Sequence, residues 1–379
     1  MLTTHPSIML GSYFWDEDRL PRDEFDIRLA PLRRAMAENG WPALIVYGDA
    51  REHAALAWLS NFIPRMRWAM ALLPAKGEPR LLAAMSSRDV PAMRTMTWIA
   101  DVRSGWEWQW FDEWIATLGG GTIGTIGFEL MTPLLFGSVE RSIAGKLALT
   151  EADDLAAMAR ASQRPREIAV IRAAAAAATA AGAAFLEGWQ RGADVETAAL
   201  AAERIARGMA AQDVRTLVSR NGGRSLEPYR ARFDDRPAQL LGHVAVKYLG
   251  YWAELFVGSG VGAAAAQARR ALDAMLAELR PGASLEHLAA VARSGLAGWT
   301  PHPALSGTFG HRIGLSPCEG DVIRDGAIGT IQPGTAYALR AGAWDADAGG
   351  AIASAMAVSA ANGRVDILAR SPDQPAAMH

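Results

Sequence analysis

The sequence has little of what secreted, membrane-embedded or nucleic-acid-binding proteins depend on. It contains 1 cysteine, Cys318, so no disulfide can form within one chain, and this suits a reducing cytoplasm. The formal net charge is −2, which offers no strongly basic surface to nucleic acid or to an anionic membrane. We therefore expect a cytoplasmic protein without nucleic-acid or membrane partners.

The sequence also shows no pattern typical of a targeting segment or a membrane-spanning helix. The first residues carry acidic side chains instead of a basic segment followed by an apolar run, so we expect no signal peptide. The longest uncharged apolar stretch, Ala173 to Leu186, is mostly alanine and is too short to span a bilayer. Alanine favours helices and lets neighbouring elements approach closely, so this stretch predicts a packed helix.

Helix and strand patterns alternate through the first part of a chain whose 379 residues suggest two domains. Apolar positions recur at helical spacing from Phe25 to Asn39, and Gly40 ends this predicted helix. This alternation predicts an α/β domain over residues 1–160. Short apolar runs typical of buried strands lie at residues 43–47, 68–73, 80–84 and 122–128.

The second domain is predicted over residues 161–379. It begins with a linker-like segment, and Pro165 then starts a long predicted helix. It contains a weak internal repeat. Asp194 and Ser284 each follow a Gly-Ala pair and precede an alanine-rich helix, and both are expected N-caps. The repeat predicts an α+β domain with pseudo-twofold halves. The alternative is that Gly-Ala-polar is simply a common helix start.

Three segments of the second domain follow an order and spacing typical of one superfamily. They are RPREI at 164–168, GYWAEL at 250–255, and FGHRIGL at 309–315 with a later QPG at 332–334. In the first domain, ALIVYGDA at 43–50 and LSNF at 59–62 extend the pattern. The chain resembles the creatinase, aminopeptidase P and methionine aminopeptidase superfamily. The resemblance implies a creatinase-type N-terminal α/β domain, a C-terminal pita-bread domain, and usually a homodimer.

Peptidases of this superfamily hold two divalent metals with two Asp, one His and two Glu. Two neighbouring hard cations need several carboxylates to offset their charge. The resemblance maps the second Asp onto Glu254 and the metal-binding His onto His311. It maps the first Asp onto His243, although Gly242-His243 could instead match the turn before that strand.

The remaining family positions have lost their carboxylates. The first metal-binding Glu maps onto Arg340 and the second near Ser354, while a proton-handling His maps onto Cys318, beside Glu319. A guanidinium stays charged and repels a neighbouring cation by about 4 kcal/mol per unit pair at ~4 Å and an effective dielectric of ~20. We therefore expect no metal pair and no cofactor.

Two other possibilities follow from the same superfamily. A single divalent metal could bind His243, Glu254 and His311, which form a plausible zinc set. Creatinases instead work without metal, with Glu at the Glu254 position and a His that shuttles protons. Here the shuttle position is Tyr229 and the later creatinase Glu is Arg340, so creatine is a poor candidate substrate.

These features predict a metal-independent, creatinase-like enzyme that hydrolyses or otherwise cleaves a C–N bond in a small amino-acid-like or amide-containing metabolite. Glu254, His311 and His243 are the expected catalytic residues, with acid–base roles. The plainer interpretation is a surface carboxylate and structural histidines. Two further functions stay open: an Xaa-Pro dipeptidase-like metallohydrolase with an altered site, and a non-catalytic ligand-binding protein.

Arg340 is expected to receive a substrate carboxylate, although it could equally pair with Glu254 and close the site. Trp252 would share a strand face with Glu254. Cys318 could be a nucleophile if His311 activated it, whereas a lone buried thiol more often only packs. The expected substrate-binding residues are Arg340, Tyr229, Arg230, Trp252, Cys318 and Glu319.

Three tryptophans, Trp106, Trp108 and Trp110, stand at alternate positions. A strand here would place all three on one face. That face would either cover the active site of a dimer partner or simply pack in a core or interface.

Overall fold

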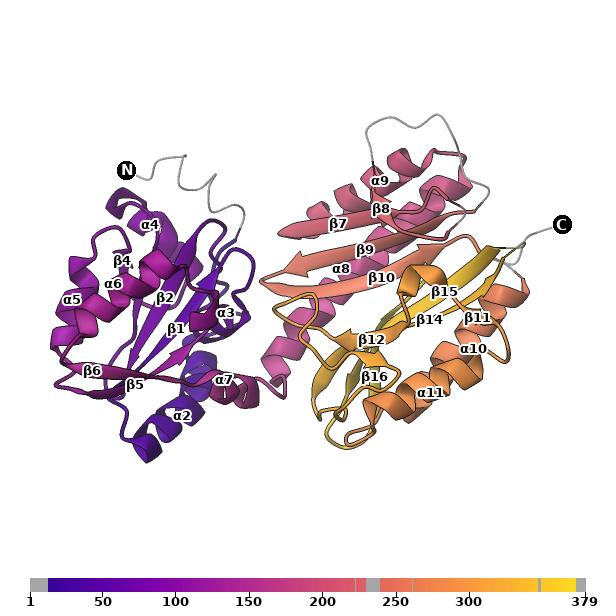
Figure 1. Cartoon of the computed structure of the whole chain (residues 1–379). Helices are drawn as coiled ribbons and strands as arrows, with labels where there is room; N and C mark the ends of the chain where they lie inside the picture. The colour runs from indigo at the N-terminus through magenta and orange to yellow at the C-terminus, as the bar shows by residue number, and fades with distance from the viewer. Residues whose placement is uncertain (1–12, 222, 230–238, 261, 347–348, 373–379) are drawn as a thin grey trace. The chain divides into compact units, whose positions relative to one another are not determined.

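The computed structural model describes residues 13–221, 223–229, 239–260, 262–346 and 349–372 (Figure 1). The chain divides into two compact units, Met1–Ala161 and Ser162–His379. Each unit has its own sheets and buries its own apolar core.

The first unit is built on one mixed sheet in the order β4-β3-β2-β1-β5-β6, in which β1 pairs antiparallel with β2 and parallel with β5. The predicted helix and the four predicted strands correspond to α2, β1, β2, β3 and β5, which confirms the α/β prediction. The strands are β1 (Ala43–Asp49), β2 (Trp68–Pro74), β3 (Arg80–Ala83), β4 (Asp101–Ser104), β5 (Gly121–Ile126) and β6 (Leu147–Glu151). The helices are α2 (Arg22–Asn39), α3 (Ala54–Ser60), α4 (Val90–Met93), α5 (Gln109–Ala116), α6 (Pro133–Ile143) and α7 (Asp153–Ala159).

The three alternating tryptophans do not lie on one strand, whereas the alternative that they pack in a core holds for Trp108 and Trp110. The chain turns after β4, where the Ser104 hydroxyl accepts the Trp106 amide, and it enters α5 at Gln109. Trp108 and Trp110 pack against the core beside the sheet, whereas Trp106 is 51% exposed. The helical turn thus separates side chains that a strand would have placed on one face.

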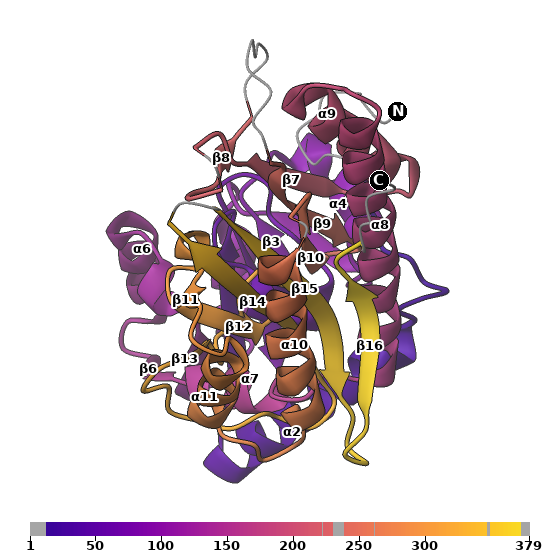
Figure 2. The same cartoon turned by 90° about the vertical axis from the view of Figure 1, so that its right-hand side faces the viewer.

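The second unit repeats one arrangement, a pair of helices followed by a sheet, as the internal repeat predicted (Figure 2). The first sheet has the order β10-β9-β7-β8 and the second β13-β12-β14-β15-β16, with β11 paired to β14. The first half contains α8 (Pro165–Gln190), α9 (Val195–Gly208), β7 (Asp213–Val218), β8 (Glu227–Pro228), β9 (Leu241–Tyr248) and β10 (Tyr251–Gly258). The second half contains α10 (Ala263–Glu278), α11 (Leu285–Gly295), β11 (Thr300–Pro301), the 3₁₀ turn η4 (Pro303–Leu305), β12 (Thr308–Arg312), β13 (Ile323–Arg324), β14 (Thr335–Asp345), β15 (Gly349–Ser359) and β16 (Val365–Arg370).

The repeated helix starts have the predicted caps. The Asp194 side chain accepts the Thr197 amide at 2.7 Å, and the Ser284 hydroxyl accepts the His287 amide at 3.3 Å. Both contacts satisfy backbone donors that a helix start leaves without a partner.

The alanine-rich stretch belongs to α8, which is longer than the sequence pattern indicated. By length and composition alone, this helix is the one in the described part of the chain that could cross a membrane. Half of the most apolar 18-residue segment of this helix is buried inside the protein, and the helix packs against α9, β9 and β10. Small side chains let these elements approach closely, as expected for a packed helix.

The contact between α8 and β9 is closest at Gly242. A Cβ atom added there would lie 2.4 Å from Cε1 of Phe185, whose ring is fully buried on α8. Gly242 therefore sets the distance between this helix and the sheet that carries the candidate site.

We predict that Gly242→Ala lowers the free energy of unfolding by about 1–3 kcal/mol, because a packed core cannot absorb the extra methyl group without strain. Urea unfolding followed by circular dichroism measures this change. Gly208→Ala is the matched control, since a Cβ there meets no atom within 4 Å. Equal stability of the two variants would contradict the close contact.

Candidate functional site

Two neighbouring strands in the first sheet of the second unit, β9 and β10, place alternating side chains on one face of that sheet. β9 and β10 pair with Phe256 opposite His243 and with Glu254 opposite Ala245. Side chains alternate between the faces of a strand, and directly opposed residues share a face. His243, Glu254 and Phe256 therefore lie on the same face of this sheet.

The second sheet of this unit contributes side chains from the face that does not pack against α10 and α11. Along β14, Tyr337 and Leu339 belong to the core beneath these helices, so Ala338 and Arg340 face the other way. His311 on β12 pairs with Ala338 and shares that face.

Three side chains from these two faces meet at the carboxylate of Glu254, which is buried. Its Oε2 lies 3.4 Å from His243 Nε2, and its Oε1 lies 3.2 Å from both His311 Nε2 and Arg340 Nη1. Arg340 Nη2 also donates to Thr308 Oγ1 at 2.7 Å. The structure thus brings together the three residues predicted to be catalytic and Arg340. We call Glu254, His243, His311 and Arg340 the Glu254 cluster.

The charges in the cluster compensate one another. Burial alone would raise the pKa of Glu254, but His243 and His311 outweigh burial and hold that pKa well below its usual range. Glu254 is therefore ionised at neutral pH. Burial lowers the pKa of Arg340 against the opposing effect of Glu254, yet an arginine stays protonated. Its Nε is buried and has no hydrogen-bond partner among the described residues.

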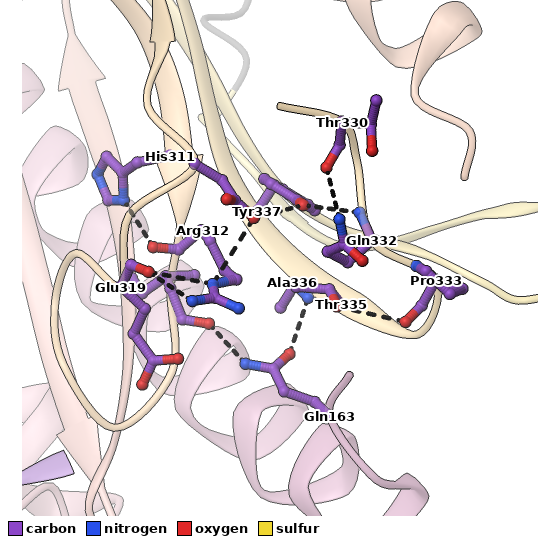
Figure 3. A network of polar contacts seen from close by, with 12 residues as sticks. Gln163, His311, Arg312, Glu319, Thr330, Gln332, Pro333, Thr335, Ala336 and Tyr337 are labelled. Atoms are coloured by element: carbon purple, nitrogen blue, oxygen red, sulfur yellow. Dashed lines mark hydrogen bonds and ion pairs between the residues drawn. The ribbon is translucent and has the colours of Figure 1, made fainter. Parts of the chain in front are cut away.

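His311 is engaged at both ring nitrogens. Nε2 faces Glu254, and Nδ1 lies 3.2 Å from the carbonyl oxygen of Arg312. Figure 3 shows how the neighbouring backbone is fixed: the Arg312 guanidinium donates twice to the Glu319 carbonyl, and Gln163 bonds backbone groups beside β12 and in β14 at 2.8 Å each. His311 is thus held in place, with no ring nitrogen left over for a ligand.

His243 is placed differently. Its ring packs against Phe256 with the ring centroids 4.8 Å apart, and its Nε2 faces Glu254. Among the described residues, none forms a hydrogen bond with Nδ1 of His243. A neutral imidazole that donates Nε2–H to a carboxylate keeps a lone pair on Nδ1. Nδ1 of His243 is therefore the ring nitrogen of the cluster that is left for a ligand.

A cleft of about 280 Å³ opens beside the cluster. His243, Glu254 and Arg340 line it, whereas His311 does not. The sequence pattern did not indicate the remaining lining residues, because the direction of each side chain depends on strand pairing and on the fold of the segment before β12. These residues are Leu217, Leu226, Phe256, Ala304, Leu305, Ser306 and Thr308.

Trp252 and Tyr229, both predicted to bind substrate, lie away from this cleft. Trp252 shares the face of Glu254 as expected, but it is buried with the Arg215 guanidinium 4.6 Å and Lys247 Nζ 5.4 Å from its ring. The Tyr229 hydroxyl bonds to Glu203 on α9, and burial together with that carboxylate raises the pKa of Tyr229. Both side chains are thus committed to contacts elsewhere in this unit.

Cys318 and Glu319, which were also predicted to bind substrate, do not line the cleft, whereas Arg340 does. Cys318 is exposed in the loop after β12, so it is not the packing thiol of the plainer interpretation. The Glu319 carboxylate accepts the Ser316 amide at 3.2 Å and stabilises that same loop. Arg230 lies outside the described residues.

The donor set does not fit a pair of metal ions. Among the described residues, no three His, Cys, Asp or Glu side chains are grouped to hold a metal. The cluster offers one carboxylate, already in contact with a guanidinium, and two dications need several. Ser354, near the second Glu position, accepts the Phe256 amide at 2.8 Å and contacts Ser371 Oγ. His243, Glu254 and His311 face one another rather than a shared centre.

The cleft-lining residues 304–306 come directly after a buried histidine, His302, and its neighbour Pro303 in the chain. The His302 amide donates to the Gly342 carbonyl at 2.9 Å, its Nδ1 accepts the Ala304 amide at 3.3 Å, and its ring meets Trp344 edge-on. Burial lowers the pKa of His302 to about 4. This part of the cleft wall is therefore anchored by a neutral imidazole whose Nδ1 must stay unprotonated.

We predict that the protein loses stability as the pH falls from 6.5 towards 4, because in this window the unfolded chain protonates His302 and the folded chain does not. The loss amounts to at most ~3 kcal/mol. Urea unfolding between pH 7 and pH 5 measures it. His302→Phe should flatten this dependence, whereas His287→Phe, at an exposed histidine, should leave it unchanged. The depressed pKa of Glu254 adds its own loss only below its ordinary value of 4.5. An unaltered slope in His302→Phe would refute this assignment.

Comparisons with known proteins support the fold. Residues 28–162 match the creatinase/prolidase N-terminal domain. The prolidase from Pyrococcus horikoshii superposes with a TM-score of 0.74 at 16% identity, covering 92% of this chain and 99% of the prolidase chain. The X-Pro aminopeptidase from Thermotoga maritima gives 0.73 at 20% identity, with 90% and 97% covered. None of the curated proteins compared with the chain is significantly similar in sequence.

These similarities confirm the predicted two-domain fold, with a creatinase-type N-terminal domain followed by a pita-bread domain. The N-terminal domain of the FACT complex subunit SPT16 from chickpea (Cicer arietinum) also superposes, with a TM-score of 0.62 at 14% identity over 91% of this chain and 95% of that domain. Its name is not that of a peptidase. One fold can carry unrelated functions, so the activity has to be argued from the site.

Proposed function

Because the chain has the two-domain fold of the creatinase and prolidase superfamily, we propose that it is a metal-independent hydrolase of a C–N bond in a small amide-containing metabolite. One observation carries the proposal: His243, His311 and Arg340 converge on the buried carboxylate of Glu254 beside a cleft. A carboxylate and an imidazole in contact are the groups that general acid–base catalysis uses.

The reaction starts at His243, the imidazole that lines the cleft. Its Nδ1 takes a proton from a water molecule, whose oxygen attacks the amide carbonyl carbon. The Glu254 carboxylate stabilises the resulting imidazolium. The imidazolium then gives the proton to the amide nitrogen, the C–N bond breaks, and the products are a carboxylic acid and an amine.

The other members of the cluster bind and position. His311 holds Glu254 Oε1 from the side away from the cleft and acts through that carboxylate. Arg340, held by Thr308, presents a cation to an anionic group of the substrate. Acid–base roles were expected for both His311 and His243, and the engagement of both ring nitrogens of His311 supports His243 as the residue that transfers the proton.

We predict that His243→Gln lowers kcat by about 10²–10⁴-fold, the usual contribution of a general base. His311→Gln should lower kcat by about tenfold and shift the acidic limb of the pH–rate profile, because it changes the charge next to Glu254. Release of primary amine from a panel of small amides, followed by mass spectrometry, gives both rates. A larger loss in His311→Gln than in His243→Gln would reverse these roles.

The second candidate function is an Xaa-Pro peptidase that uses metal, favoured by the full-length superposition on a prolidase and an X-Pro aminopeptidase. The single carboxylate of the cluster and its contact with Arg340 favour the metal-independent reaction instead.

Metal analysis separates the two candidates. We predict that the purified protein holds substoichiometric zinc, manganese and cobalt, and that chelator leaves amide hydrolysis unchanged. Xaa-Pro dipeptides incubated with manganese should stay intact. Stoichiometric metal together with manganese-dependent release of proline would establish the peptidase. Metabolite binding without turnover by any panel member would establish a non-catalytic ligand-binding protein.

The partners and the compartment belong to the same proposal. We propose a cytoplasmic homodimer that binds a small molecule, from the resemblance to dimeric family members and from the single cysteine. Light scattering coupled to gel filtration measures the mass of the assembly.

A further inference from the structure

At the polar end of the cleft, the described lining residues offer no unpaired carboxylate to a cationic group of a ligand. Among the described residues that line the cleft, Glu254 is the only carboxylate. It already contacts two imidazoles and a guanidinium at 3.2–3.4 Å. An ammonium group entering here would gain no free carboxylate and would lie near the cation of Arg340.

Arg340 gives the same end of the cleft an affinity for anions. Its Nη1 and Nη2 each have one partner, and its Nε is buried without one in the described structure. A guanidinium has five N–H donors, so Arg340 keeps donors for a ligand carboxylate. A carboxylate bound here would replace part of the contact that Arg340 now makes with Glu254.

The rest of the cleft is mostly apolar. Its volume of about 280 Å³ suits a molecule of amino-acid size. Ser306, whose backbone is left-handed with φ 49°, and Thr308 add two hydroxyl groups. The apolar wall consists of Leu217, Leu226, Phe256, Ala304 and Leu305.

From these three observations we propose that the cleft takes amine-blocked amino acids: N-acylated acids with a free carboxylate on Arg340, a compact apolar side chain on the Leu226 wall, and no ammonium group. The proposal rests on the proposed function in that it treats this cleft as the active site. It separates this chain from an exopeptidase, which must accept a free α-ammonium group. Hydrolysis of such a ligand releases the acyl group as a carboxylic acid and the amino acid as a free amine.

Four matched probes test each element of the ligand. N-acetyl-L-leucine and glycyl-L-leucine differ only in the ammonium group. N-acetyl-L-leucine amide lacks the carboxylate, and N-acetylglycine lacks the apolar side chain. Isothermal titration with the full-length protein at pH 7 gives the four dissociation constants, and mass spectrometry of the same mixtures detects released amino acid.

We expect N-acetyl-L-leucine to bind at least ~10-fold more tightly than each of the other three probes, a difference that one lost charge pairing or one empty apolar pocket readily supplies. Arg340→Met should remove the preference for the acid over its amide, while Arg340→Lys keeps the charge and should retain part of it. Leu226→Trp should weaken the binding of N-acetyl-L-leucine without altering the charged groups. Arg172→Met, at an exposed pair with Asp366, is the control and should bind as the unaltered chain does.

The outcomes separate this inference from the proposed function. Equal or tighter binding of glycyl-L-leucine, or no binding of N-acetyl-L-leucine, overturns the ligand class. Selective binding without release of leucine keeps the ligand class and removes the hydrolytic function. Hydrolysis without any preference for the blocked amine keeps the hydrolytic function and removes the ligand class. Circular dichroism of each variant shows whether a loss of binding reflects a loss of folding.

Discussion

The site depends on one electrostatic constraint: the buried carboxylate of Glu254 has to be compensated. An ionised carboxylate inside a protein costs several kcal/mol unless hydrogen-bond donors and opposite charges surround it. Here the compensation comes from His243 on β9, His311 on β12 and Arg340 on β14, so it joins both half-sheets of the second unit. Removal of any one partner leaves a buried charge under-compensated, which ties the folding of the unit to the composition of its site.

The same constraint explains why the cleft differs from a metal centre built on the same fold. Two dications need an excess of carboxylates, whereas Glu254 is a single carboxylate balanced by one guanidinium. Ser354 contributes no charge and instead bonds the Phe256 amide, which links β15 to β10. The result is a site with one carboxylate and one guanidinium, in which one imidazole, His243, lines the cleft and the other, His311, does not. This balance of charges is the basis of the proposed metal-independent reaction.

Local rules succeeded where the determining contacts lie within a few residues. Asp194 and Ser284 cap helices as predicted, because a cap needs only a side-chain oxygen and an amide two or three residues on. The alternation around Trp106 failed, because a turn and a helix start replaced the expected strand. Tyr229 was assigned to the site because the resemblance places the shuttle position there, and Trp252 because it shares a strand face with Glu254, but their partners Glu203 and Arg215 come from other elements. Contacts of this kind have no signature in a local pattern.

The sequence by itself determined the alternating elements of the first domain and the repeated helix starts, and its resemblance to the superfamily implied the pita-bread domain and the site positions of Glu254, His243, His311 and Arg340. Periodicity, capping and motif order are properties of the chain, and they carry over directly into secondary structure and topology. Only the tertiary structure decided which imidazole reaches the cleft, which hydroxyl holds Arg340, and which apolar residues form the wall. Those features depend on strand register and on the packing of two separate sheets, where a shift of one residue would turn every side chain to the opposite face.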